Sequence, residues 1–199
     1  MIEGIAPELV DAMRARHGES QRHYHDWTHI EALLTHAEAI RSSLHDPDAV
    51  THAILFHDAI YDPQASDNER RSADLLRETS VAVSAESKAL AIRMILATEG
   101  HQLPEDLSAD EREDCAHFLD MDLAILGASE ERFDLYEDQI RREYAHVPHK
   151  AFRKGRAAIL RAFIARDTLY FSAWGKERFE AKARANCARS IARLEGGEE

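Results

Sequence analysis

The sequence has little of what secreted and membrane-spanning proteins usually contain. Among its 199 residues there are only two cysteines, Cys115 and Cys187, which form no CxxC pair. They therefore predict reduced thiols and no disulfide framework. No stretch approaches the roughly 18–20 consecutive apolar residues that a membrane-spanning helix needs. Residues 1–18 also lack an apolar core behind a basic start, so no signal peptide is expected. These absences predict a soluble protein of the cytoplasm that does not act at a membrane.

Positive charge is also scarce, and this restricts the partners that the chain can have. The sequence carries 25 Lys and Arg against 37 Asp and Glu, a formal net charge of -12. Such a surface repels the phosphate backbone, so a nucleic-acid partner is not expected. A small anionic substrate remains compatible, provided that a local cation offsets the field. The chain contains no P-loop, no GxGxxG motif and no nucleophile elbow, which removes three common classes of site.

Helix signals dominate what the sequence does contain, whereas no alternating run of strand length occurs. Capping residues precede apolar segments with helical spacing, and no internal repeat or linker separates them. The sequence therefore predicts an all-α bundle of about eight or nine helices in one domain, 1–199, with a disordered tail at 194–199. The expected helices include one from Asp46–Pro47 to about Tyr61, one after the capping box Ser108–Glu111 that stops at Gly127, segments capped by Ser84 and Ser129, one from Pro148, and one over 176–194.

A His-Asp pair lies inside the most apolar of these segments, "HAILFHDAIYD", residues 52–62. At about 100° per residue, His57 falls on the apolar surface of the expected helix, and Asp58 follows directly. Burial of an unpaired carboxylate costs several kcal/mol, so the pair needs either a cation or a dense hydrogen-bond network. A purely structural pair and a metal site both satisfy that requirement.

The segment "CAHFLDMDLAIL", residues 115–126, contains two acidic residues with different expected surroundings. On a helical wheel, Asp122 lies close to the centre of the apolar stripe, whereas Asp120 lies about 160° away. Asp120 is therefore expected to be solvated. A carboxylate in the middle of an apolar face breaks the local pattern, and such breaks tend to mark function.

Three histidines crowd into "RHYHDWTHI", residues 22–30, at the start of another expected helix. If Asp26 caps this helix, His29 is its third residue and borders the apolar stripe, while His25 precedes the cap, where chains fold back over the first turn. His25 and His29 can then face one cavity, whereas His23 and His36 are expected at the surface. Imidazoles together with carboxylates suit a divalent transition metal such as Mn, Fe, Co, Ni or Zn.

The ordered set His29, His57–Asp58 and Asp122 resembles the H…HD…D signature of the HD superfamily of metal-dependent phosphohydrolases. "YHDWTH" is similar to the Y-H-N-x-x-H motif of cyclic-nucleotide phosphodiesterases, with Asp26 in place of Asn, and "HDAIYD" resembles the H-D-x-x-E-D segment of alarmone hydrolases, with Tyr61 in place of Glu. From about residue 7 to 194 the chain looks like a bacterial group of predicted HD phosphohydrolases.

The resemblance implies both a ligand set and an activity. One divalent ion (Mn, Fe, Co, Ni, Zn or Mg) is expected on His29, His57, Asp58 and Asp122. His25 is expected as general acid, Asp62 as the group that orients the attacking water, and Glu69 as a general base or a helix-capping residue. The implied reaction is hydrolysis of a phosphate ester or anhydride of a small molecule, with a nucleotide as the expected substrate.

Two other functions remain open from the sequence. A di-iron HD oxygenase needs additional histidine ligands, for which His101 is the candidate as an additional ligand or substrate contact. A regulatory module could instead retain the metal site without catalysis. Cationic side chains that could contact phosphate are Arg22, Arg141, Arg142, Lys150, Lys154 and Arg156.

Overall fold

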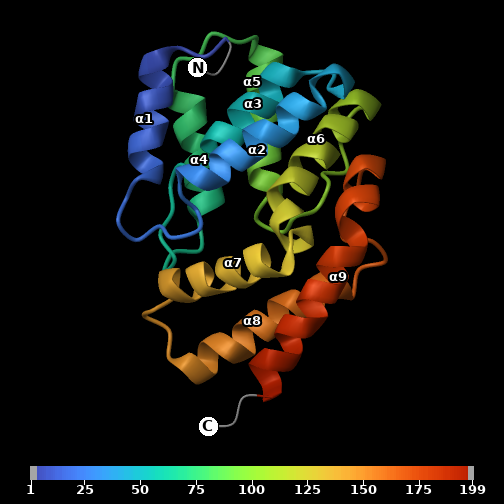
Figure 1. The fold of residues 1–199 in the computed structure, drawn as a ribbon. Coiled ribbons are helices and arrows are strands. Elements are labelled where there is room, and N and C mark those ends of the chain that lie inside the picture. Colours follow the sequence, from blue (N-terminus) through green and yellow to red (C-terminus); the bar gives the residue numbers. More distant parts are fainter. Residues whose placement is uncertain (1–3, 197–199) are drawn as a thin grey trace. The chain divides into compact units, whose positions relative to one another are not determined.

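The computed structural model describes residues 4–196, and this part of the chain is all-helical with no strand (Figure 1). The predicted all-α architecture of eight or nine helices is thereby confirmed. The helices are α1 (Pro7–His17), α2 (Trp27–Ala39), α3 (Pro47–Phe56), α4 (Asn68–Glu78), α5 (Ala85–Ala97), α6 (Ala109–Asp122), α7 (Glu130–Glu143), α8 (His149–Ile164) and α9 (Ala173–Gly196), with 3-10 helices η1 (Arg41–Ser43) and η2 (Leu123–Gly127). None of the described helices is both long and apolar enough to cross a membrane.

The helix starts are set by the capping residues that the sequence contains. The Asp26 carboxylate accepts hydrogen bonds from the backbone N–H groups of Thr28 and His29 at 2.8 and 3.3 Å, so α2 begins at Trp27. Ser108 and Glu111 form the expected reciprocal box before α6, with Ser108 N donating to Glu111 Oε2 at 2.8 Å. These contacts satisfy N–H groups that have no partner inside the helix. The predicted positions of these helix starts are confirmed.

The chain groups into two compact units, of which the first ends at Met121 and the second begins at Asp122. In the first unit α3 is the central helix and packs against α2, α4 and α5, while α4 also packs against α5. In the second unit α9 packs along α8 and against η2, as the orange and red ribbons of Figure 1 show for α8 and α9. The boundary between the units falls between Met121 and Asp122, inside α6. Asp122 is therefore the last residue of a helix that otherwise belongs to the first unit.

The helix that carries the His-Asp pair ends earlier than the sequence predicts. It was expected to run to about Tyr61, but α3 ends at Phe56. The backbone N–H of Ala59 bonds to the carbonyl of Phe56 at 3.0 Å, a tighter turn than an α-helix, and places His57 and Asp58 in the turn after α3. At the other end of the chain, 194–196 belong to α9 rather than to a tail, and 197–199 lie outside the described residues.

The expectation that Asp120 is solvated is wrong. Only 1% of Asp120 is exposed, and every residue of α6 from Asp114 to Met121 is buried. The helical wheel assumes that a helix has one wet face, but this part of α6 is covered all round. Asp120 is therefore a buried polar group, and its burial follows from the packing of α6 and not from its sequence pattern.

Candidate metal centre

Three side chains from separate helical segments form the one group among the described residues that could hold a metal ion. One ligand atom each from His29, His57 and Asp122 lies within 4.8 Å of the other two. His29 is in the first turn of α2, His57 directly follows α3, and Asp122 is the last residue of α6. Residues up to 93 positions apart in the sequence thus converge, as the ordered H…HD…D pattern predicted.

The two imidazoles present their Nε2 atoms to each other. His57 Nδ1 lies 2.9 Å from the carbonyl oxygen of Ile54, which can only accept, so in the neutral ring Nδ1 carries the proton and Nε2 carries the lone pair that a cation would bind. His29 Nε2 lies 3.2 Å from His57 Nε2, and both residues are buried. Two nitrogens that each bind one ion at about 2.1 Å lie roughly 3.0–3.4 Å apart. The spacing and the fixed His57 tautomer therefore fit a shared divalent cation.

The Asp58 carboxylate lies beside the two imidazoles, although Asp58 is not part of the group that His29, His57 and Asp122 form. Its Oδ2 lies 3.1 Å from His57 Nε2 and 3.7 Å from His29 Nε2, and its side chain is 18% exposed. Burial by itself raises the pKa of this carboxyl, but the imidazoles of His57, His25 and His29 together hold the pKa of Asp58 well below its usual range. Asp58 is therefore a carboxylate at neutral pH, which is the form that a cation requires.

The position of Asp122 follows from the face of α6 on which it lies. Phe118, one turn earlier on the same face, packs edge-on against the His57 ring with a centroid distance of 5.8 Å. After Asp122 the chain continues as η2, which α9 fixes within the second unit. Asn186 Nδ2 donates to the carbonyl oxygens of Leu126 and Ala128 at 2.9 and 3.1 Å. The end of α6 is thus followed by a segment with little freedom.

His25, the candidate general acid, lies beside the metal-ligand group without belonging to it. Its ring packs on Tyr61 at 4.4 Å, on Tyr24 at 5.0 Å and on His29 at 6.0 Å between centroids. The rings of His25 and His29 are therefore neighbours, while a cavity that both face stays a prediction. The ring is half-buried, so it combines contact with the centre and access to solvent.

Three other predicted site residues lie outside the metal-ligand group. Asp62 is exposed and its Oδ1 accepts from the backbone N–H of Gln64 at 2.9 Å, which stabilises the loop before α4. Glu69 is half-buried in the first turn of α4. His101 has a backbone φ of 45°, a conformation that residues other than glycine adopt at a cost of about 1 kcal/mol. Their proposed roles in water orientation, base catalysis and substrate contact stay predictions.

Two of the candidate phosphate-binding arginines are buried and bonded to other protein groups. Arg22 is buried and bonds to Glu19 and to three backbone carbonyls. Arg156 is buried in the second unit, where it pairs with Glu137 and donates to Tyr136 Oη at 2.7 Å. Use of these bonded N–H groups for a phosphate would break the contacts just described. The sequence suggested phosphate contacts for them because it does not reveal which arginines are buried.

Sequence reasoning missed His17, a histidine at the end of α1 that is only 1% exposed. Its Nδ1 bonds to the Met13 carbonyl at 2.9 Å, whereas its buried Nε2 has no hydrogen-bond partner. Burial, assisted by the charge of Arg22, lowers the pKa of His17 to about 4, against the opposing hydrogen bond to Met13. His17 is therefore neutral near pH 7. The one signal in the sequence was its spacing of four residues from Met13.

The metal-free protein is expected to lose stability in mild acid through His17. The unfolded chain binds a proton near pH 6.5 and the folded chain only near pH 4, so stability falls as the pH falls through this window. The loss from this group reaches at most about 3 kcal/mol. Urea unfolding at pH 4 to 7 in a chelator should show a shallower slope for His17→Gln than for the wild type.

His45 provides the opposite control for that series. It is exposed, and its hydrogen bond to Glu113 raises the pKa of the imidazole. Its contribution is therefore complete at low pH and is lost as the pH rises through the folded pKa. His45→Gln should therefore make the rise of the free energy of unfolding with pH steeper, or leave it unchanged. Equal slopes for wild type and His17→Gln would show that His17 does not titrate as its burial implies.

Comparison of the chain with family models, with curated proteins and with solved structures finds no match. The resemblance to the HD superfamily therefore depends on the motif residues of the sequence alone.

Proposed function

We propose that this protein is a metal-dependent phosphohydrolase that cleaves a phosphate ester or anhydride of a small molecule, with nucleotides as the first class to test. The observation that supports the proposal most directly is the convergence of His29, His57 and Asp122, with the Asp58 carboxylate beside both imidazoles. Two imidazoles and two carboxylates form a donor set that suits a divalent transition metal and leaves positions for other ligands. A bound divalent ion would supply Lewis-acid activation of water and offset charge on the phosphoryl group.

The chain's own residues would divide the remaining work. The Ile54 carbonyl accepts from His57 Nδ1, so the neutral His57 ring would present its Nε2 lone pair to a cation in a fixed direction. His25 packs on the neighbouring Tyr61 and His29 rings and is half-buried, which suits donation of a proton to a leaving oxygen at neutral pH. Tyr24 is buried and packs against the His29 ring at 4.8 Å between centroids, which restrains that ring.

Metal analysis followed by a phosphate-release screen tests the proposal. Protein purified without chelator should contain about one equivalent of a divalent transition metal, as one ligand group predicts. It should release phosphate from at least one of a panel of nucleotides and sugar phosphates, with a rate that depends on added Mn²⁺ or Co²⁺. His57→Ala should lose both the metal and the activity, because it removes a buried ligand.

His36→Ala is the matched control, since His36 is on the same helix as His29 but outside the ligand group. It should retain metal and activity. Tight metal binding without turnover on any phosphorylated compound would replace the proposal by a non-catalytic metal-binding module. Two equivalents of iron with oxygen consumption would indicate a di-iron oxygenase instead. Full metal occupancy in His57→Ala would show that the site has been assigned to the wrong residues.

A further inference from the structure

A buried arginine joins the two segments that carry the candidate general acid and the His-Asp pair. The Arg22 side chain is 0% exposed and precedes α2. Its Nη1 donates to the carbonyl oxygens of His25 at 3.0 Å and Asp58 at 2.7 Å, and its Nη2 donates to the carbonyl of Ala59 at 3.3 Å. Its Nε donates to the Glu19 carboxylate at 3.1 Å. Every nitrogen of the guanidinium is therefore engaged.

These contacts hold together two segments that are distant in sequence. His25 lies in the loop before α2, whereas Asp58 and Ala59 form the turn after α3, 36 and 37 residues from Arg22. The guanidinium also lies over the Tyr61 ring at 5.4 Å, and that ring packs on His25 at 4.4 Å. One side chain thus contacts the backbone of the candidate acid, the backbone of Asp58 and the ring on which His25 rests.

We propose that Arg22 is a positioning residue that holds the Asp58 carboxylate and the His25 ring in the arrangement that the metal centre needs. The proposal rests on the proposed metal site, and it assigns to Arg22 a role other than phosphate binding. The turn after α3 has left the helix, so the Asp58 carbonyl has no helical partner of its own. Arg22 supplies that partner and thereby restrains the backbone from which the Asp58 side chain projects.

Arginine suits this role because of its planar, forked set of donors. A guanidinium can donate to several carbonyls at once in fixed directions, whereas an ammonium is a single point donor on a flexible stem. Buried carbonyls that lose their donor cost about 1–3 kcal/mol each, so the turn would rearrange to find other partners. Partners that orient a metal ligand typically change metal affinity 10–100-fold when they are removed.

Cobalt binding to the full-length protein tests the role of Arg22. Arg22→Met retains most of the side-chain volume and removes all donors, and Arg22→Lys retains the charge with one donor group. We expect Arg22→Met to bind Co²⁺ at least about 10-fold more weakly than the wild type, with a changed visible absorption spectrum, and Arg22→Lys to be intermediate. Calorimetric titration and the cobalt spectrum are measured at a temperature where each metal-free variant is folded.

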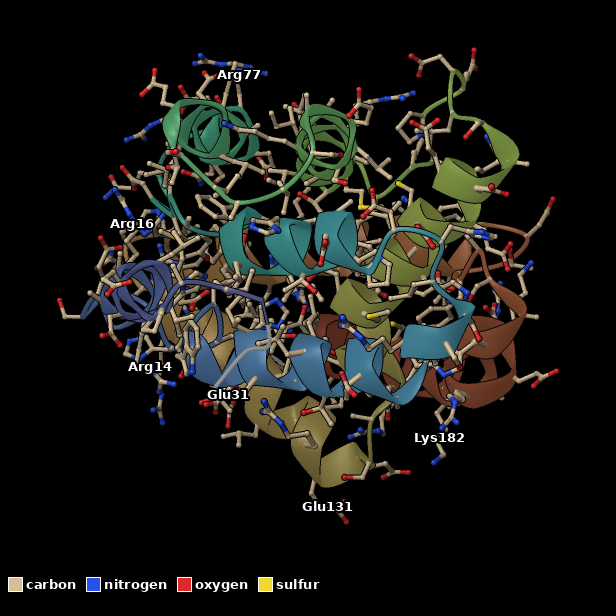
Figure 2. All side chains as sticks on the ribbon, turned by 90° about the horizontal axis from the view of Figure 1, so that it is seen from above. Arg14, Arg16, Glu31, Arg77, Glu131 and Lys182 are labelled. Carbon is tan, nitrogen blue, oxygen red and sulfur yellow. The ribbon has the colours of Figure 1, made fainter. Side chains whose placement is uncertain are left out.

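Arg14→Met is the matched control. Arg14 also stacks on an aromatic ring, that of Trp27 at 4.5 Å, but its side chain is 56% exposed and its ion-pair partner is Glu31. Both Arg14 and Glu31 lie at the periphery of the first unit (Figure 2). Arg14→Met should bind Co²⁺ within about twofold of the wild type, because exposed pairs contribute little.

The outcomes separate the role of Arg22 from the proposed function. Unchanged cobalt affinity and an unchanged spectrum in Arg22→Met would overturn the role, even if that variant had a lower melting temperature. If Arg22→Met does not fold but Arg22→Lys does, a cobalt affinity and spectrum of Arg22→Lys equal to those of the wild type would also overturn it. Weakened binding in Arg22→Met without phosphate release by the wild type would support the role and refute the phosphohydrolase. A wild-type protein that binds no cobalt would overturn both, since there would be no ligand set to position.

Discussion

Asp122→Asn is expected to abolish tight binding of a divalent cation, whereas Asp120→Asn is expected to leave the binding intact. Asp122 belongs to the group whose ligand atoms lie within 4.8 Å of one another, together with two buried histidines. Asparagine retains the volume but removes the negative charge that offsets the cation. The affinity for Co²⁺ should therefore fall by more than about 100-fold, since removal of groups that only orient a metal ligand already lowers metal affinity about 10–100-fold.

Asp120 should show the reverse pattern, although it is only two residues away. At 1% exposure its carboxylate is held within the all-round packing of α6, so Asp120→Asn should lower the free energy of unfolding by about 1–3 kcal/mol. Cobalt titrations and urea unfolding of both variants decide the matter. If Asp120→Asn lost the metal while Asp122→Asn kept it, the site would have to be rebuilt around the other face of α6.

Gly127→Ala is expected to be strongly destabilising although it adds only one methyl group. Gly127 ends η2, and a Cβ added there would lie 2.6 Å from Phe179 Cβ and 2.8 Å from the Phe179 Cα and carbonyl oxygen. Phe179 is part of α9, and its backbone cannot yield without displacing that helix. We expect a loss of about 3 kcal/mol and a melting temperature lower by roughly 6–12 °C.

Gly155→Ala provides the matched control for this close approach. Gly155 is inside α8, and a Cβ added there would meet no heavy atom within 4 Å. Alanine in an unobstructed helix interior should raise the stability by about 0.5–1 kcal/mol. Calorimetric melting of both variants therefore should give shifts of opposite sign. Equal melting temperatures would mean that η2 and α9 are not packed as closely as the distances indicate.

The sequence by itself determined the helical architecture, because the signals for helices are local. Asp26, Ser84, Ser108 and Ser129 each cap a helix within three residues of themselves, and these contacts form as expected. The spacing of apolar residues likewise singled out Asp122, although the structure leaves Asp122 half-buried and buries Asp120 more completely. The convergence of His29, His57 and Asp122 was predicted from the order of the motif, which a single pair such as His57–Asp58 could not have indicated.

Only the tertiary structure decided the surroundings of these residues, because burial and hydrogen bonds across the fold depend on residues distant in sequence. Asp120 is buried because α6 is covered on every side from Asp114 onward, which a single-faced helical wheel cannot represent. Arg22 donates to backbone carbonyls 36 and 37 residues away, and these partners cannot be read from its own sequence context. His17 stays neutral because burial, and not its own sequence context, sets its pKa. Local patterns fix where helices begin and which face is apolar, whereas packing determines which charges lose their water and which partners they gain instead.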